Sequence, residues 1–287
     1  NEVSKTSISS FLNMSDKGKI LGQGAGNKVT EYVISDRSCK DYGRSWAYRY
    51  NIYPENVANL FMEVILTRML SSEGIAPETY AIEIDHYAGK VYYAMEKMDG
   101  DLHELLHTAK PKDIPGIERQ LMTLFGRMAK NDVFCVDIKP GNVVYKKHGK
   151  KVILKLIDFD GVHCQKPTGL YNVRGVLIKV LVKRKYKLTV PQVNKIIRDA
   201  MLFVFSVNST HNRMGLLKKY VKSLTKRDLN KIKYILEITY TSNFQAVNPV
   251  RTMNHYINRR FRDNRLSLAE IIKRHKSKNG IEILTTS

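Results

Sequence analysis

Asp137, Lys139 and Asn142 lie close together in the segment FCVDIKPGNVVY, and Asp158 follows in LKLIDFDG at the end of a predicted strand. A carboxylate can orient an attacking hydroxyl, a lysine can neutralise a moving phosphoryl group, and amide and carboxylate oxygens are ligands for Mg²⁺. Taken singly, each residue has a plainer explanation as a turn, cap or hairpin-end residue. Their joint spacing favours a phosphoryl-transfer site, with Asp137 and Lys139 as catalytic residues and Asn142 and Asp158 as metal ligands.

A glycine-rich loop, LGQGAGNKV, occupies residues 21–29. Small residues let backbone N–H groups approach phosphate oxygens without a side-chain clash. Predicted strands flank the loop on both sides, whereas the glycine loop of a dinucleotide-binding fold runs into a helix. A hairpin turn without a ligand is the alternative. If the loop holds phosphates, the residues that contact the nucleotide are Gly22, Gly24, Gly26 and Val29.

The elements predicted around these residues change from strands to helices along the chain. Strands are expected within 17–52, a helix over about 55–71, and two strands, TYAIEID and KVYYAMEKM, around a turn at 86–89. A buried helix over 117–130 follows, then a hairpin with a basic turn near 148–149, and helix and loop beyond 161.

This order predicts an α+β protein in two lobes, a small β-rich N-lobe and a larger, mainly helical C-lobe. We expect a loose, Ser/Thr-rich leader over residues 1–16, the N-lobe over 17–98 and the C-lobe over 99–287. The hinge between the lobes is expected near 98–100.

Over residues 17–161 the sequence resembles a eukaryotic-type protein kinase in its glycine loop, in the D-x-K-x-x-N pattern and in the DFD segment. The resemblance implies a bilobal protein-kinase-like fold. It also implies that ATP lies beneath the glycine loop, that Asp137 faces the substrate hydroxyl, and that Asn142 and Asp158 hold Mg²⁺ or Mn²⁺. The lysine at position 139, two residues after the aspartate, resembles the pattern of serine/threonine kinases rather than that of tyrosine kinases.

The resemblance further implies a cation on the third strand and a glutamate on the following helix. The segment WAYR occupies the expected place, and Ala47 and Arg49 point to the same face of a strand. Ala47 would lie over the adenine and Arg49 at the phosphates. Arginine and lysine are not interchangeable at such a site, so Lys28 is a second candidate for the cation. Glu63 is the expected partner, although a mid-helix glutamate is more often solvated.

The strand VYYAMEKMDGD resembles the fifth strand of a kinase running into the hinge. Met95 would be the gatekeeper residue. The backbone of Glu96 and Met98 would contact the adenine, and Asp101 the ribose. A strand end followed by an acidic turn is the alternative interpretation.

The sequence departs from the kinase pattern at Cys135-Val136, where the family has His-Arg before the aspartate. The absent arginine normally receives an activation-loop phosphate, so activity without that phosphorylation is expected. No A-P-E motif follows, and two activation segments are possible. In the shorter, YNVRGVLIKVLVKR forms the next core helix; in the longer, IIRDAMLFVFSV forms it, with Asp199 as its buried aspartate. Such losses are typical of the protein kinases of large DNA viruses and of bacterial effectors, and the lysine-rich, divergent sequence favours a poxvirus-like or asfarvirus-like source.

Three functions are compatible with these motifs. The first is a serine/threonine protein kinase that uses Mg-ATP, supported by Asp137, Asn142 and Asp158. The second is a pseudokinase scaffold, favoured by Arg49 in place of lysine and by the altered catalytic loop. The third is a small-molecule kinase of the aminoglycoside-phosphotransferase type, similar at D-x-x-P-G-N and IDFDG.

The composition restricts the setting and the partners. No apolar run approaches the roughly 20 residues of a membrane-spanning helix. The chain has three cysteines, which are widely spaced, and this favours a reducing compartment. We therefore expect a cytoplasmic protein, located in the host cytoplasm or the virion if it is viral. We also expect a monomer. Residues 1–157 carry 22 Lys and Arg against 19 Asp and Glu, net +3, and residues 158–287 carry 26 against 8, net +18. The C-lobe therefore suits polyanions and protein substrates that are acidic or associated with nucleic acid, although a solvated basic surface gives the same pattern.

Overall fold

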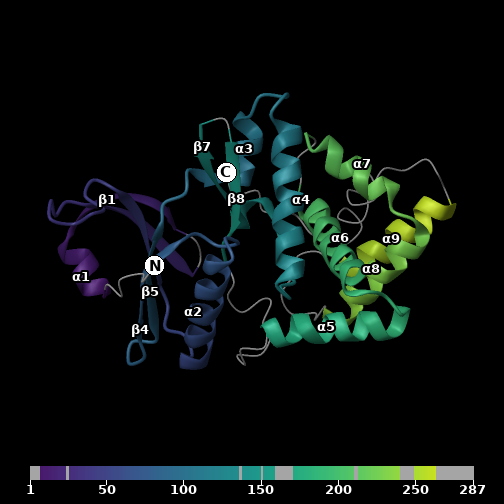
Figure 1. The fold of residues 1–287 in the computed structure, drawn as a ribbon, viewed down its shortest axis with the longest axis horizontal. Coiled ribbons are helices and arrows are strands. Elements are labelled where there is room, and N and C mark those ends of the chain that lie inside the picture. The colour runs from purple at the N-terminus through teal and green to yellow at the C-terminus, as the bar shows by residue number, and fades with distance from the viewer. Residues whose placement is uncertain are drawn as a thin grey trace. The chain divides into compact units, whose positions relative to one another are not determined.

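The computed structural model describes residues 7–23, 26–135, 138–149, 151–158, 171–209, 213–239 and 249–262. The chain divides into two compact units: unit 1 is Asn1–Asp101 with Asn142–Leu170, and unit 2 is Leu102–Gly141 with Tyr171–Ser287. The described strands belong to unit 1, and helices form the described part of unit 2 (Figure 1). The mixed α+β class expected from the sequence is therefore confirmed. The division differs from the expected border after residue 98, because residues 142–170 return to unit 1.

Unit 1 is built on a five-stranded antiparallel sheet in the order β1-β2-β3-β5-β4. Its strands are β1 (Ser15–Gln23), β2 (Asn27–Ile34), β3 (Ser45–Asn51), β4 (Thr79–Asp85) and β5 (Lys90–Glu96). The turn between β4 and β5 spans 86–89, as predicted. Gly89 is required there, because its φ is +63° and a Cβ would lie 2.9 Å from the carbonyl oxygen of Glu55.

Helix α2 (Val57–Ser72) joins β3 to β4 and covers one face of this sheet, which we call the α2 face. Leu60 of the helix packs against Val91 and Tyr93 of β5, and none of the three is exposed to solvent. The alternation of side chains along an antiparallel strand places Ala47 and Arg49 of β3 on this same face, because they pair with Met95 and Tyr93. The helix predicted over about 55–71 is thus confirmed.

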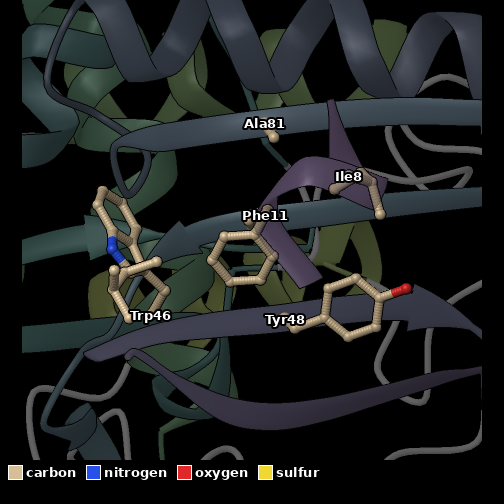
Figure 2. Close-up of a cluster of buried hydrophobic side chains, with 7 residues drawn as sticks. Ile8, Phe11, Trp46, Tyr48 and Ala81 are labelled. Carbon is tan, nitrogen blue, oxygen red and sulfur yellow. The ribbon is translucent and has the colours of Figure 1, made fainter. Parts of the chain in front are cut away.

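The opposite face of the sheet, the α1 face, is covered by helix α1 (Ile8–Asn13). Phe11 is fully buried between the rings of Tyr32, Tyr48 and Tyr80, with ring centroids 5.9–6.4 Å apart. Figure 2 shows Phe11 inserted among Ile8, Trp46 and Tyr48. Residues 8–16 therefore differ from the loose leader that the Ser/Thr-rich composition predicted: apolar residues within it complete the core of unit 1.

A second sheet of unit 1 has three strands in the order β6-β7-β8. They are β6 (Gly100–Asp101), β7 (Val143–His148) and β8 (Lys151–Leu156), so the hairpin predicted here is confirmed. Backbone hydrogen bonds attach it to the rest of the unit. The N–H of Leu156 donates to the carbonyl of Ile75 (2.7 Å), and the N–H of Asp99 donates to the carbonyl of Tyr145 (2.8 Å).

Unit 2 is a set of helices arranged around α6. The described helices are α3 (Leu102–Thr108), α4 (Ile114–Lys130), α5 (Tyr171–Tyr186), α6 (Val190–Asn208), α7 (Gly215–Ser223), α8 (Lys226–Thr239) and α9 (Pro249–Arg262). Helix α6 packs against α4, α5, α7 and α8. Among the helices that the structure describes, none is long and apolar enough to cross a bilayer.

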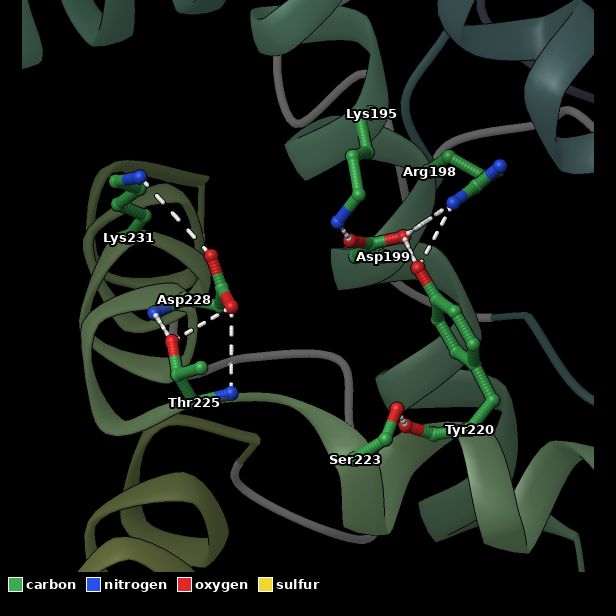
Figure 3. A network of polar contacts seen from close by, with 8 residues as sticks. All are labelled: Lys195, Arg198, Asp199, Tyr220, Ser223, Thr225, Asp228 and Lys231. Carbon is green, nitrogen blue, oxygen red and sulfur yellow. Dashed lines mark hydrogen bonds and ion pairs between the residues drawn. The ribbon is translucent and has the colours of Figure 1, made fainter.

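Asp199 lies in the middle of α6 and is almost completely buried. Its carboxylate accepts hydrogen bonds from Lys195 (2.8 Å), Arg198 (3.0 Å) and the hydroxyl of Tyr220 on α7 (2.8 Å), as Figure 3 shows. These charge-assisted bonds compensate for the removal of the carboxylate from water and hold α7 against α6. The sequence left two helices possible as the one that follows the activation segment, residues 171–184 and residues 196–207. The second lies in α6, which has a buried aspartate and lies at the centre of its unit.

We predict that Phe11→Ala lowers the free energy of unfolding by about 3–5 kcal/mol, because it leaves a cavity in a packed aromatic core. Denaturant unfolding can be followed by the fluorescence of Trp46, which is 1% exposed in the same cluster. Phe61→Ala is the matched control, since Phe61 on α2 is 52% exposed, and its loss should stay below about 1 kcal/mol. Equally small losses in both variants would show that α1 adds nothing to the core.

Candidate active site

Arg49 and Glu63 form a buried ion pair between β3 and α2. The guanidinium contacts the carboxylate directly, and the side chains are only 14% and 4% exposed. The guanidinium carbon also lies 5.2 Å from the centre of the Tyr93 ring. Burial, followed by the charge of Glu63, raises the pKa of Tyr93 well above its ordinary value, so this phenol stays neutral beside the pair. The sequence paired these two residues correctly across fourteen positions.

Lys28, the second candidate for the cation, lies on the other face of the sheet. The register between β2 and β3 is unbroken and pairs Val29 with Arg49 and Lys28 with Tyr50. Side chains alternate along a strand, so Val29 shares the α2 face with Arg49, whereas Lys28 shares the α1 face with Tyr50. The structure therefore brings Arg49, and not Lys28, to Glu63 and Ala47.

The glycine loop connects β1 to β2, and Gly24 lies outside the described residues. At Gly22 and Gly26 a Cβ atom would meet no atom of the described residues within 4 Å, and neither glycine has a positive φ. Neither crowding by protein nor backbone conformation therefore requires glycine at these two positions. The open space at these two positions is compatible with a ligand bound by the loop and equally with a ligand-free turn.

Asn142 and Asp158 lie at the adjoining ends of the β7–β8 hairpin. Residues 140–142 form a short 3-10 helix that leads into β7, and the side chain of Asn142 is buried. The carbonyl of Asn142 accepts a hydrogen bond from the N–H of Ile157 (2.9 Å), directly before Asp158. Asp158 is exposed and has a φ of +69°, in the sparsely populated left-handed region. The hairpin thus brings together the two residues predicted to bind a metal.

The loop predicted to carry the catalytic residues precedes this hairpin in the chain. Asp137 lies outside the described residues. Lys139 is exposed, whereas its neighbour Ile138 is fully buried. Asn208, at the end of α6, donates a hydrogen bond to the carbonyl of Ile138 (3.0 Å) and so fixes the loop to the central helix of unit 2. This anchor cannot be predicted from the sequence, because an asparagine 70 residues away carries no local signal.

The residues predicted to form the hinge run along the edge of the hairpin. Glu96 ends β5, and its carboxylate accepts a hydrogen bond from the ammonium of Lys155 on β8 (2.6 Å). Burial alone would raise the pKa of Glu96, but the bond and charge of Lys155 hold it below the ordinary value. Met98 is half-buried, and Asp101 pairs with Val144 in the second sheet. The backbone N–H of Glu96 donates to the carbonyl of Glu78 (2.7 Å). This N–H is therefore occupied, and of the two backbone groups of Glu96 only the carbonyl could contact a nucleotide.

The donor set fits the groups that the sequence implied. Amide and carboxylate oxygens at one hairpin end suit Mg²⁺ or Mn²⁺, which prefer oxygen ligands. A guanidinium and a loop of unhindered glycines suit the phosphates of a nucleotide. In unit 1, the helix between β3 and β4 and the five-stranded antiparallel sheet agree with the β-rich first lobe that the sequence predicted.

No protein-family model and no curated protein matches the chain. Among solved structures, the chain is similar to the kinase PK-1 of the Cydia pomonella granulovirus, with a TM-score of 0.40 and 16% sequence identity. The match covers 53% of this chain and 53% of that kinase, about half of its length. A likeness of this size defines neither the fold nor the function of the chain.

We predict strong energetic coupling between Arg49 and Glu63. Glu63→Leu should lower the free energy of unfolding by about 3 kcal/mol, because a buried guanidinium loses its carboxylate. The double variant Arg49→Met/Glu63→Leu should be more stable than the sum of the single losses predicts, since both charges are then absent. Denaturant unfolding of the wild-type protein, of Arg49→Met, of Glu63→Leu and of the double variant measures the coupling. Additive losses of the free energy of unfolding would contradict a buried ion pair.

Proposed function

We propose that the protein is an ATP- and Mg²⁺-dependent serine/threonine protein kinase, active without activation-loop phosphorylation. The observation that carries the proposal is the buried contact between Arg49 and Glu63 on the α2 face, beside Ala47. Buried ion pairs add little to stability compared with apolar residues of the same size. A guanidinium held at this position is better explained by a phosphate group that it must bind.

The residues divide into those that would hold the nucleotide and those that would act on the substrate. Backbone amides of the glycine loop and the Arg49 guanidinium would bind phosphate oxygens, while Ala47 and the backbone of Met98 would contact the adenine and Asp101 the ribose. Asn142 and Asp158 would hold the metal ion, which when bound neutralises charge on the phosphates.

Asp137 would accept the proton of the attacking serine or threonine hydroxyl and direct its oxygen at the γ-phosphorus. Lys139 would stabilise the negative charge of the phosphoryl group in flight. In protein kinases, an arginine at the position of Val136 binds the phosphate of the activation loop. Because valine stands there in this chain, no cation at that position needs the phosphate, and activity should not require phosphorylation of the activation loop.

We predict that Asp137→Asn and Asp158→Asn each lower phosphoryl transfer from labelled ATP by roughly a thousandfold, since each removes a charged group from the reaction centre. Asp113→Asn is the matched control, because Asp113 is an exposed residue before α4 whose side chain makes no capping hydrogen bond. The substrates compared are basic proteins, acidic proteins and small alcohols. Transfer only to a small alcohol would favour the small-molecule kinase, and no transfer with Mg²⁺ or Mn²⁺ would favour the pseudokinase.

The cation at the phosphates can be assigned with a second pair of variants. Arg49→Ala should raise the KM for ATP at least about tenfold, because a charge-assisted contact to phosphate is lost. Lys28→Ala should leave it within about twofold, because Lys28 lies on the α1 face. Steady-state kinetics with varied ATP give both values. A large rise for Lys28→Ala alone would assign the phosphates to that lysine instead.

A further inference from the structure

A cavity of about 510 Å³ opens on the α1 face of unit 1, on the opposite side of the sheet from Arg49 and Glu63. Its apolar wall includes Ile8 and Leu12 of α1. Its floor is aromatic, and its rim carries carboxylates from the end of β4. The proposed kinase reaction uses none of these groups.

The floor of the cavity contains Tyr48 and Tyr92, whose rings are nearly parallel at 16° with centroids 6.2 Å apart. Tyr48 is only 8% exposed, yet its hydroxyl has no hydrogen-bond partner among the described residues. Figure 2 shows this hydroxyl directed away from Phe11 and out of the aromatic cluster. Burial, followed by the neighbouring Tyr92, raises the pKa of Tyr48, so the hydroxyl is neutral and available to a ligand.

The rim carries Glu83 and Asp85, which alternate onto the same face of β4, with Glu83 directly across from Tyr92. Glu83 makes no ion pair or hydrogen bond with another described residue, although the chain has a net charge of +21. The Oδ1 atom of Asp85 accepts the N–H groups of Tyr87 (3.0 Å) and Ala88 (2.9 Å) and is thereby fixed in place. Lys90, across from Asp85, places its ammonium 5.8 Å from the Tyr50 ring instead.

We propose that this cavity, the α1-face pocket, binds the side chain of an arginine in a partner protein. A guanidinium is planar and can lie against the tyrosine rings while it donates to carboxylate oxygens at the rim. The methylene stem of the arginine would pack along Ile8 and Leu12, and the Tyr48 hydroxyl oxygen would accept a hydrogen bond from a remaining guanidinium N–H. A lysine ammonium is a compact, strongly hydrated charge and would use the aromatic floor less well.

The test is binding of a fluorescein-labelled peptide of glycine and serine with one central arginine, measured by fluorescence anisotropy. Glu83→Gln should weaken binding by about fivefold, the upper range for a solvent-exposed ion pair. Glu73→Gln, which removes the same charge from an exposed position after α2, should leave the affinity unchanged. A peptide with citrulline in place of arginine keeps the shape without the charge, and its affinity should fall by a similar factor.

Tyr48→Phe is a second variant that leaves folding unaffected, because the hydroxyl it removes has no partner among the described residues. It should weaken binding by about twofold to fivefold while the Trp46 fluorescence stays unchanged. Equal binding of the peptide by the wild-type protein and Glu83→Gln, or equal binding of the arginine and citrulline peptides, would overturn the proposal. Binding of free agmatine without binding of the peptide would overturn the assignment to a protein partner. Asp137→Asn should not change the affinity, so this test is separate from the test of phosphoryl transfer.

Discussion

The buried contact between Arg49 and Glu63 joins β3 to α2 and is the constraint on which the candidate site in unit 1 depends. Two charges removed from water must remain together, so the register of β3 and the rotation of α2 are fixed relative to each other. A shift of β3 by one residue would turn Arg49 toward the α1 face and leave the Glu63 carboxylate buried without this guanidinium. The apolar contacts of Leu60 with Tyr93 hold α2 against β5, the neighbour of β3 in the sheet, but they would tolerate small displacements that an ion pair does not.

The boundary between the units separates the proposed reaction into two groups of residues. Arg49, Glu63, Asn142 and Asp158 all belong to unit 1, because Lys155 and the residues after β5 attach the β7–β8 hairpin to the first sheet. Lys139 belongs to unit 2, where Asn208 fixes the preceding residue to α6. The groups proposed to hold the nucleotide and metal are therefore carried by one compact unit, and the lysine proposed to act during transfer is carried by the other.

The sequence predicted the elements whose stabilising contacts are local or periodic. Apolar spacing and turn residues predict helix α2, the turn at 86–89 and the β7–β8 hairpin. The spacing of the kinase pattern was enough to pair Arg49 with Glu63. Helix α1 was not predicted, because its stability depends on an aromatic surface formed by strands that come later in the chain. The choice between Arg49 and Lys28 needed the register of β2 on β3, which the sequence alone does not fix. The α1-face pocket combines residues from three strands of the sheet, a turn and α1, and no single segment signals it.

The backbone of Asp158 limits which amino acids this position can accept. Its φ of +69° is a conformation that glycine, asparagine and aspartate adopt readily, whereas alanine or a branched residue there costs about 1–3 kcal/mol. Asparagine or glycine at this position would thus keep the hairpin intact while removing the carboxylate that is proposed to hold the metal ion. The same geometry makes alanine scanning misleading here, because a folding defect would be mistaken for a catalytic one.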